Sequence, residues 1–222
     1  SVLRTKRIES DRPVSASVSL TQPGSSALDE ETARAELYGV LSQLYYAPPS
    51  PELLSALRVA VTEAPMEGGF LQEPWQQLVA AARAQDDAVI AAEYDRLFGG
   101  VGKPEVFVYA SHYLAGFLNE KPLARLRTSL DRLGLARGDT MPETEDHVAY
   151  LCEVMRYLIA GADMAVCNLT AQRDFFAEHI QPWLPAMCNA LEQHPAASFY
   201  AAVARLTRAF AAVEAQGFDM LD

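Results

Sequence analysis

The sequence changes abruptly from charged to apolar residues after His147. Residues 143–147 read Glu-Thr-Glu-Asp-His, and residues 148–159 are almost entirely apolar or aromatic. Acidic side chains are favoured in the first turn of a helix, because unpaired backbone N–H groups and the positive end of the dipole lie there. We therefore predict a helix that begins among these acids, with a capping box formed by residues 140–143.

At helical spacing, this segment would present two neighbouring faces. The first face would pack in the core, and it consists of His147, Leu151, Val154 and Leu158. The second is acidic and aromatic, as expected of the wall of a groove, and it consists of Asp146, Tyr150, Glu153 and Tyr157. The alternative is a well-capped core helix with a hydrogen-bonded histidine and no binding role.

The composition favours an all-helical fold in one domain. The chain has 222 residues, and 50% of them are hydrophobic, which is enough for a substantial core. Residues 1–28 lack periodicity and are predicted to be a disordered tail. We expect an N-terminal helical part at 29–134, a linker at 135–143 and a C-terminal helical part at 144–218. The linker is either a hinge or an ordinary surface loop.

The predicted helix ends follow from local signals. Ser50 and Pro51 are typical of a helix start, and Gly134 and Gly161 are typical of helix ends. Gly68-Gly69 should break the chain. One helix near residues 175–184 would be bent or interrupted by Pro182 and Pro185, and a last helix at 197–216 would be capped by Gly217.

The charge of the chain argues against several classes of partner. The formal net charge is −11, and residues 1–28 hold four basic and two acidic side chains, so the remainder carries −13. Such a body should repel nucleic acid and anionic membranes and attract basic peptides.

No apolar run approaches the roughly 20 residues that span a bilayer. The three cysteines suggest reduced thiols, so we expect a cytoplasmic protein without membrane insertion.

The residues give little support for catalysis. The four histidines form neither a His-Glu-x-x-His nor a paired Glu-x-x-His pattern, so no metal and no other cofactor are expected. No Gly-x-Ser-x-Gly elbow occurs. The glycine-rich loop at 99–104 lacks the Gly-Lys-Ser/Thr ending of a phosphate-binding loop. We therefore expect a binding protein, with a nucleotide hydrolase as the alternative from another class.

Three segments together resemble the TorD/DmsD family of molybdoenzyme maturation chaperones. Residues 94–102 are similar to its Tyr-x-x-Leu-Phe-x-Gly-Pro-Gly motif, and residues 143–147 to its Glu-Pro-x-Asp-His motif. Residues 175–183 are similar to its late Phe-x-x-x-His-x-x-x-Trp helix. The sequence departs from the family pattern at Val101, Val108, Ala110 and Thr144, which leaves the client enzyme open.

The resemblance implies an all-helical chaperone that binds the twin-arginine signal peptide and the body of a molybdoenzyme precursor. It also implies assistance in cofactor insertion, delay of export and, in some members, domain-swapped homodimers. A NarJ-like assembly factor for a subunit that is not exported is the alternative.

Carboxylates of the candidate site would accept arginine, and aromatic residues would line a slot for the apolar part of the peptide. His147 would either fix the groove or be a buried structural histidine. The candidate residues are Glu143, Glu145, Asp146, His147, Tyr150, Glu153, Tyr94, Leu97, Phe98, Phe107, Tyr109 and Ser111.

Overall fold

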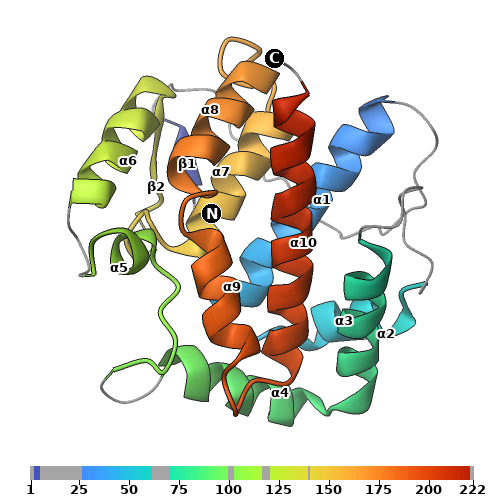
Figure 1. Cartoon of the computed structure of the whole chain (residues 1–222). Coiled ribbons are helices and arrows are strands. Elements are labelled where there is room, and N and C mark those ends of the chain that lie inside the picture. Colours follow the sequence, from blue (N-terminus) through green and yellow to red (C-terminus); the bar gives the residue numbers. More distant parts are fainter. Residues whose placement is uncertain are drawn as a thin grey trace.

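The computed structural model describes residues 3–5, 27–61, 71–99, 103–116, 121–139 and 141–220. Within these ranges the fold is all-helical apart from two very short strands, which confirms the predicted fold class (Figure 1). The elements in chain order are β1 (Leu3–Thr5), α1 (Ala27–Tyr46), α2 (Pro51–Val59), α3 (Gln72–Ala84), α4 (Asp87–Tyr94), the π-helical turn η1 (Asp95–Gly99), α5 (Ala110–Ala115), α6 (Lys121–Arg132), β2 (Leu135–Arg137), α7 (Val148–Ala160), α8 (Leu169–His179), α9 (Leu184–Glu192) and α10 (Phe199–Asp219).

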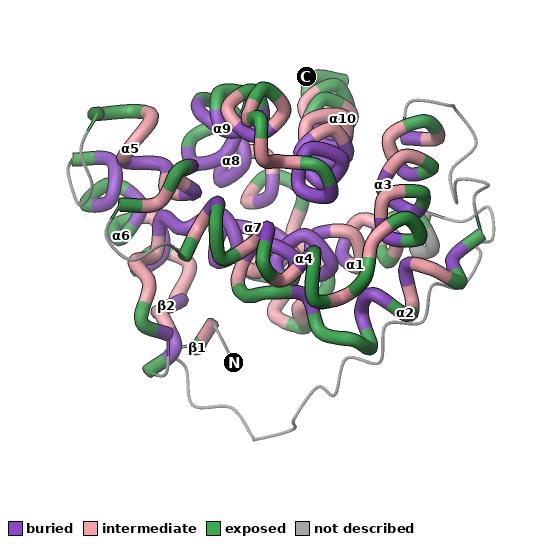
Figure 2. Tube along the Cα trace, turned by 90° about the horizontal axis from the view of Figure 1, so that it is seen from below, coloured by how far each residue is buried: buried purple, intermediate pink, exposed green. Residues whose placement is uncertain are grey.

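Helix α7 lies at the centre of the fold, as its almost unbroken apolar sequence requires. Figure 2 shows it buried along most of its length, and α1 packs closely against it. Helix α10 packs against α9 and α3, and α2 packs against α3. The predicted core face of α7 is confirmed, since Leu151, Val154 and Leu158 are all buried. The neighbouring face was expected to form the wall of a groove. Tyr150 on this face is instead fully buried.

Several predicted helix ends are confirmed. The Ser50 hydroxyl accepts a hydrogen bond from the Leu53 N–H at 3.2 Å and so caps α2, with Pro51 as its first residue. Gly134 follows α6 with φ of 69°, a conformation that favours glycine. Gly161 ends α7 where a Cβ atom would lie 2.5 Å from the Cys167 sulfur, so the close packing requires a glycine.

Other predicted boundaries are wrong. Helix α7 starts at Val148 and is capped by His147, so residues 140–143 do not form its capping box. Gly217 lies inside α10, which continues to Asp219 because Phe218 is still buried against the core. By contrast, the interruption expected near Pro182 and Pro185 is confirmed, because residues 175–184 are divided between α8 and α9. The predicted break at Gly68-Gly69 lies outside the described residues.

The two strands come from segments that the sequence predicted to be irregular. Leu3–Thr5, in the predicted tail, pairs antiparallel with Leu135–Arg137, in the predicted linker, with Leu3 opposite Arg137 and Thr5 opposite Leu135. A strand of three residues carries too little periodicity to be read from a sequence. The division of the chain into two helical parts joined by a hinge stays a prediction.

A carboxylate from α4 caps the start of α10. Glu93 is buried, and its side chain accepts backbone hydrogen bonds from Ser198 at 2.8 Å, Phe199 at 3.1 Å and Tyr200 at 2.8 Å. These N–H groups have no partner within the helix, so a negative charge at this point satisfies them and complements the dipole. The contact ties α4 to α10 across more than 100 residues of sequence.

Replacing Glu93 with glutamine should lower the free energy of unfolding by about 1.5–3 kcal/mol, the range for hydrogen bonds to a charged group. The amide keeps the size of the side chain but turns one acceptor into a donor that faces the helix N–H groups. Urea unfolding would measure the change. Asp86→Asn is the matched control, because Asp86 makes no side-chain capping bond to α4, and we expect a change below about 0.5 kcal/mol. Equal losses in both variants would contradict the assignment.

Candidate functional site

Residues 143–147, one segment of the family resemblance, meet residues 108–111 at the start of α7. Tyr109 and His147 form an isolated antiparallel bridge. The N–H of Ala110 donates to the Asp146 carbonyl at 3.0 Å, and the N–H of Val148 donates to the Val108 carbonyl at 2.9 Å. The fold therefore brings together four of the predicted site residues, which are Tyr109, Ser111, Asp146 and His147.

Asp146 holds this junction together from inside. Its carboxylate accepts hydrogen bonds from the Ser111 N–H at 2.9 Å, from the Ser111 hydroxyl and from the Thr144 hydroxyl at 2.6 Å. The residue is only 1% exposed. A buried carboxylate with three donors is already satisfied, so its geometric effect is to fix segment 108–111 against the start of α7.

His147 is the N-cap of α7 and is also buried. Its Nδ1 atom accepts a hydrogen bond from the Ala149 N–H at 3.1 Å, and the Tyr109 ring packs edge-on against the imidazole at 5.0 Å. Burial lowers the pKa of His147 to about 4, although the charges of Glu143 and Asp146 act in the opposite direction. The imidazole is therefore neutral near pH 7, as its acceptor role in the cap requires.

Glu143 is half-buried and acts on two tyrosines. The Tyr109 hydroxyl donates to the Glu143 carboxylate. Burial first, and then this contact with Glu143, raise the pKa of Tyr109. Burial and the charge of Glu143 also raise the pKa of Tyr94, whose hydroxyl donates to the Tyr45 carbonyl at 3.2 Å. All three residues, Tyr94, Tyr109 and Glu143, are half-buried.

Glu145 already holds a guanidinium group from its own chain. The Nε and Nη2 atoms of Arg127 lie 3.1 and 2.9 Å from the same Glu145 oxygen, and the arginine side chain is 53% exposed. Nearby, Nη1 of Arg137 donates to the carbonyls of Met141 at 2.8 Å and Glu143 at 2.9 Å. Arg137 thus fixes the backbone of residues 141–143. These residues begin the segment 141–145, which we call the acidic turn.

The remaining candidates lie in different surroundings. Leu97 and Tyr150 are buried in the core. Phe98 packs edge-on against Tyr94 and Tyr200, both at 5.0 Å, and Phe107 stacks on His112 at 4.0 Å. Glu153 lies further along α7 and pairs with Arg156 at 2.8 Å. Phe98 therefore stays in contact with Tyr94, whereas the buried Leu97 and Tyr150 do not line an exposed slot. The aromatic slot as a whole stays a prediction.

Sequence reasoning missed three residues that shape the site, namely Arg127, Arg137 and Thr144. The two arginines reach the acidic turn from α6 and β2. Nothing in the spacing of the sequence pairs these elements. Thr144 could have been found, because a threonine two residues before a buried aspartate can donate a local hydrogen bond to it.

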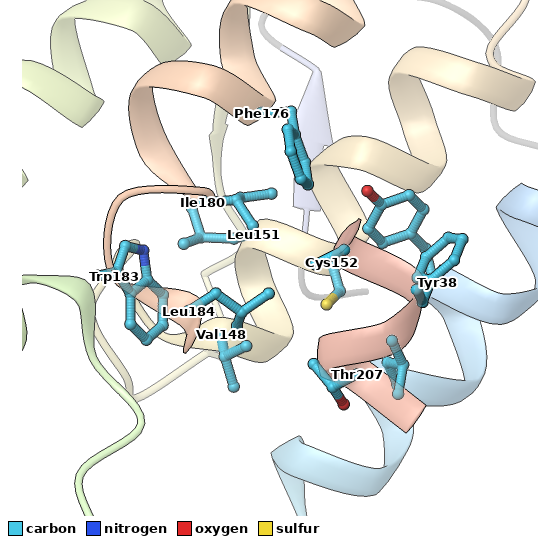
Figure 3. Close-up of a pocket in the computed structure, with 12 residues that line it drawn as sticks. Tyr38, Val148, Leu151, Cys152, Phe176, Ile180, Trp183, Leu184 and Thr207 are labelled. Atoms are coloured by element: carbon cyan, nitrogen blue, oxygen red, sulfur yellow. The ribbon is translucent and has the colours of Figure 1, made fainter. Parts of the chain in front are cut away.

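A cavity lies behind the start of α7, among α1, α7, α8, α9 and α10 (Figure 3). Its wall is almost entirely apolar, with Val148, Leu151, Ile180 and Leu184 among the lining residues. The Thr207 hydroxyl in this wall already bonds to Tyr45 and to the Val203 carbonyl. A cavity with so apolar a wall is a packing void rather than a site for a polar ligand.

Among the residues that the structure describes, no three His, Cys, Asp or Glu side chains gather in a way that could hold a metal ion. In the same part of the chain, no helix combines the length and the apolar character needed to cross a membrane.

The described residues form a helical fold whose junction fixes acids beside aromatic rings. Residues 69–189, more than half of the chain, match the family model described as nitrate reductase delta subunit. The chain therefore belongs to this family.

Curated relatives agree with this assignment. The chain is similar to the chaperone protein TorD of Vibrio cholerae serotype O1, with 31% identity over 193 residues, 80% of this chain and 88% of the relative. TorD of Photobacterium profundum is 26% identical over 64% of this chain and 71% of the relative. TorD of Shewanella loihica is 24% identical over 89% of this chain and 98% of the relative. The predicted resemblance to the TorD family is confirmed, and the names of the relatives agree with the prediction of a chaperone rather than an enzyme.

Proposed function

We propose that the chain is a chaperone for a molybdoenzyme precursor and binds the twin-arginine signal peptide of that precursor at the acidic turn. The chaperone relatives support the first part. The observation that carries the second part is the contact between Glu145 and the exposed Arg127 guanidinium, because it is the kind of contact that a client arginine would make. Binding the precursor body, assisting cofactor insertion and delaying export complete the proposed role.

The proposal assigns the arginine contacts to Glu143 and Glu145. Both belong to the acidic turn and are partly accessible, whereas Asp146 is enclosed by Ser111 and Thr144. Two carboxylates on one short turn match two neighbouring guanidinium groups, each of which can form charge-assisted hydrogen bonds. Asp146 acts as a positioning residue, and direct contact between a peptide and Asp146 stays a prediction.

The charge of the molecule supports the same kind of ligand. The chain beyond residue 28 carries a net charge of −13, which favours encounter with a basic peptide. This long-range attraction is screened within about 8–10 Å at physiological salt. Association with the peptide should therefore slow markedly as the salt concentration rises.

Calorimetric titration of a synthetic twin-arginine signal peptide tests the proposal. Glu143→Gln and Glu145→Gln should each weaken binding by about 10- to 100-fold, which corresponds to losing a hydrogen bond to a charged group of about 1.5–3 kcal/mol. Asp174→Asn is the matched control, because it removes the same charge from an exposed carboxylate on α8 and should leave the dissociation constant unchanged. A peptide with two lysines in place of the arginines should bind more weakly, since lysine lacks the bidentate fork.

Equal binding by the wild type and both glutamate variants would place the peptide elsewhere.

The family description also names nitrate reductase, which favours a second candidate. This candidate is a NarJ-like assembly factor for a subunit that is not exported. It predicts that the chain binds the body of a molybdoenzyme subunit but no twin-arginine peptide.

A further inference from the structure

The short sheet joins the first described residues of the chain to the acidic turn. Strand β1 lies along one edge of β2 and against α7 (Figure 1). Strand β2 leads directly into residues 138–147, and its Arg137 holds the Met141 and Glu143 carbonyls. Whatever pairs with this edge of β2 is therefore coupled to the backbone of the acidic turn.

The pairing between β1 and β2 is small. It comprises three residue pairs, and a two-stranded ribbon has marginal stability by itself. The ion pair between Arg4 and Asp139 spans 3.2 Å, but both side chains are more than half exposed, so it adds little. Leu3 supplies the apolar contact with the core. These features are typical of a segment at the low end of local stability.

Strand β1 has the chemistry of the proposed ligand. It is an extended segment that carries Arg4, and Lys6 and Arg7 follow it in the sequence. It adds to a strand edge through its backbone, which is one of the general ways in which peptides are recognised. The positive charge of residues 1–28, set against a body of −13, favours the same contact.

We propose that the edge of β2 is a docking site for an extended, basic segment of the client peptide, and that β1 occupies this site as an internal competitor. The inference rests on the proposed function, because it names the surface beside the acidic turn that the peptide backbone would use. A tethered competitor lowers the apparent affinity by the fraction of molecules in which the edge is free. Only peptides that complement both the edge and the acids would then displace β1.

A reversible disulfide tests the competition within one protein. Arg4 and Ala136 are direct partners in the register, and opposed residues of an antiparallel pair are close enough for a disulfide. The variant Arg4→Cys/Ala136→Cys should bind the twin-arginine peptide at least tenfold more weakly when oxidised than after reduction. The variant Arg4→Cys alone should show no such difference. Equal affinity of the two redox forms would overturn the proposal.

A second variant releases the strand without changing the charge. Leu3→Ser removes the apolar anchor of β1, and Leu20→Ser removes the same side chain outside β1 as the matched control. Leu3→Ser should bind the twin-arginine peptide at least threefold more tightly than the control. Equal or weaker binding would overturn the idea that β1 competes.

Failure of the proposed function gives a different result. If no form binds a twin-arginine peptide, that function fails, and a synthetic peptide of residues 1–11 of this chain is titrated instead. Binding of this peptide to Leu3→Ser but not to the oxidised double-cysteine variant supports the docking edge. No binding to either variant overturns it.

Discussion

Replacing Glu214 with alanine is expected to lower the free energy of unfolding by about 3–5 kcal/mol, the typical cost of breaking a buried ion pair from one side. Arg34 donates to the two Glu214 oxygens at 2.6 and 2.9 Å, and the Tyr38 hydroxyl donates at 3.0 Å. The glutamate side chain is only 3% exposed. Its removal leaves an arginine enclosed without its counter-ion.

The pKa of Arg34 reflects this environment. Burial acts to lower it, but the hydrogen bonds and the charge of Glu214 outweigh burial and raise it, so the arginine stays charged. Gln172 accepts a further bond from Arg34 at 3.2 Å and donates to the Leu158 carbonyl, which extends the network from α1 and α10 to α8 and α7. Removing the Glu214 side chain should therefore weaken the contacts among α1, α7, α8 and α10.

Urea unfolding of Glu214→Ala would measure the effect. The matched control is Asp174→Ala, which removes a carboxylate whose pairing with Arg173 is largely exposed, and it should cost about 0–1 kcal/mol. A double variant, Arg34→Met/Glu214→Leu, should recover part of the loss because no buried charge remains. Similar small losses for Glu214→Ala and the control would show that the network contributes little.

Protonation of His147 is expected to destabilise the protein by about 3 kcal/mol as the pH falls from 7.5 to 4. Burial lowers the pKa of His147 to about 4 in the folded chain, whereas the unfolded value is about 6.5. Between these values the unfolded chain binds the proton and the folded chain does not. This contribution to stability is therefore complete above about pH 6.5 and is lost as the pH falls.

The variant His147→Asn separates this effect from other titrating groups. Asparagine is a good N-cap and has no charge to gain, so its unfolding free energy should fall less steeply with acid than that of the wild type. His112 and His179, whose pKa values burial also lowers, are present in both proteins and cancel in the comparison. Parallel pH profiles, or a His147 pKa near 6.5 by NMR titration, would contradict the buried cap.

The fold was largely predictable because its longest helices carry clear apolar periodicity. In α10, Phe199, Val203, Leu206 and Phe210 recur at helical spacing, and all four are buried. The wrong helix boundaries lie where one local sequence signal is compatible with two structures. The acids before α7 are compatible with a first helical turn, but their backbone is committed to the junction with segment 108–111. Gly217 is compatible with a helix end, but burial of Phe218 outweighs it.

The candidate site was predictable in position but not in the direction of its side chains. The resemblance placed Asp146 and Ser111 in one site, and the structure joins them by hydrogen bonds. Whether the carboxylate faced solvent or the interior depended on where segment 108–111 packed, and no local pattern encodes that. The partners of Glu145 and of the 141–143 backbone come from α6 and β2, which spacing along the chain cannot match.

The packing of α1 against α7 has a consequence for how the chain is made. The two helices are separated by about 100 residues, and α7 is synthesised long after α1 has left the ribosome. Until then, the side chains of α1 that are buried in the folded protein, such as Leu41 and Leu44, have no partner on their main contact face. The core therefore closes only late in synthesis. During this delay, α1 of one nascent chain can meet α7 of another, which is a physical route to the exchanged dimers that the sequence resemblance predicts.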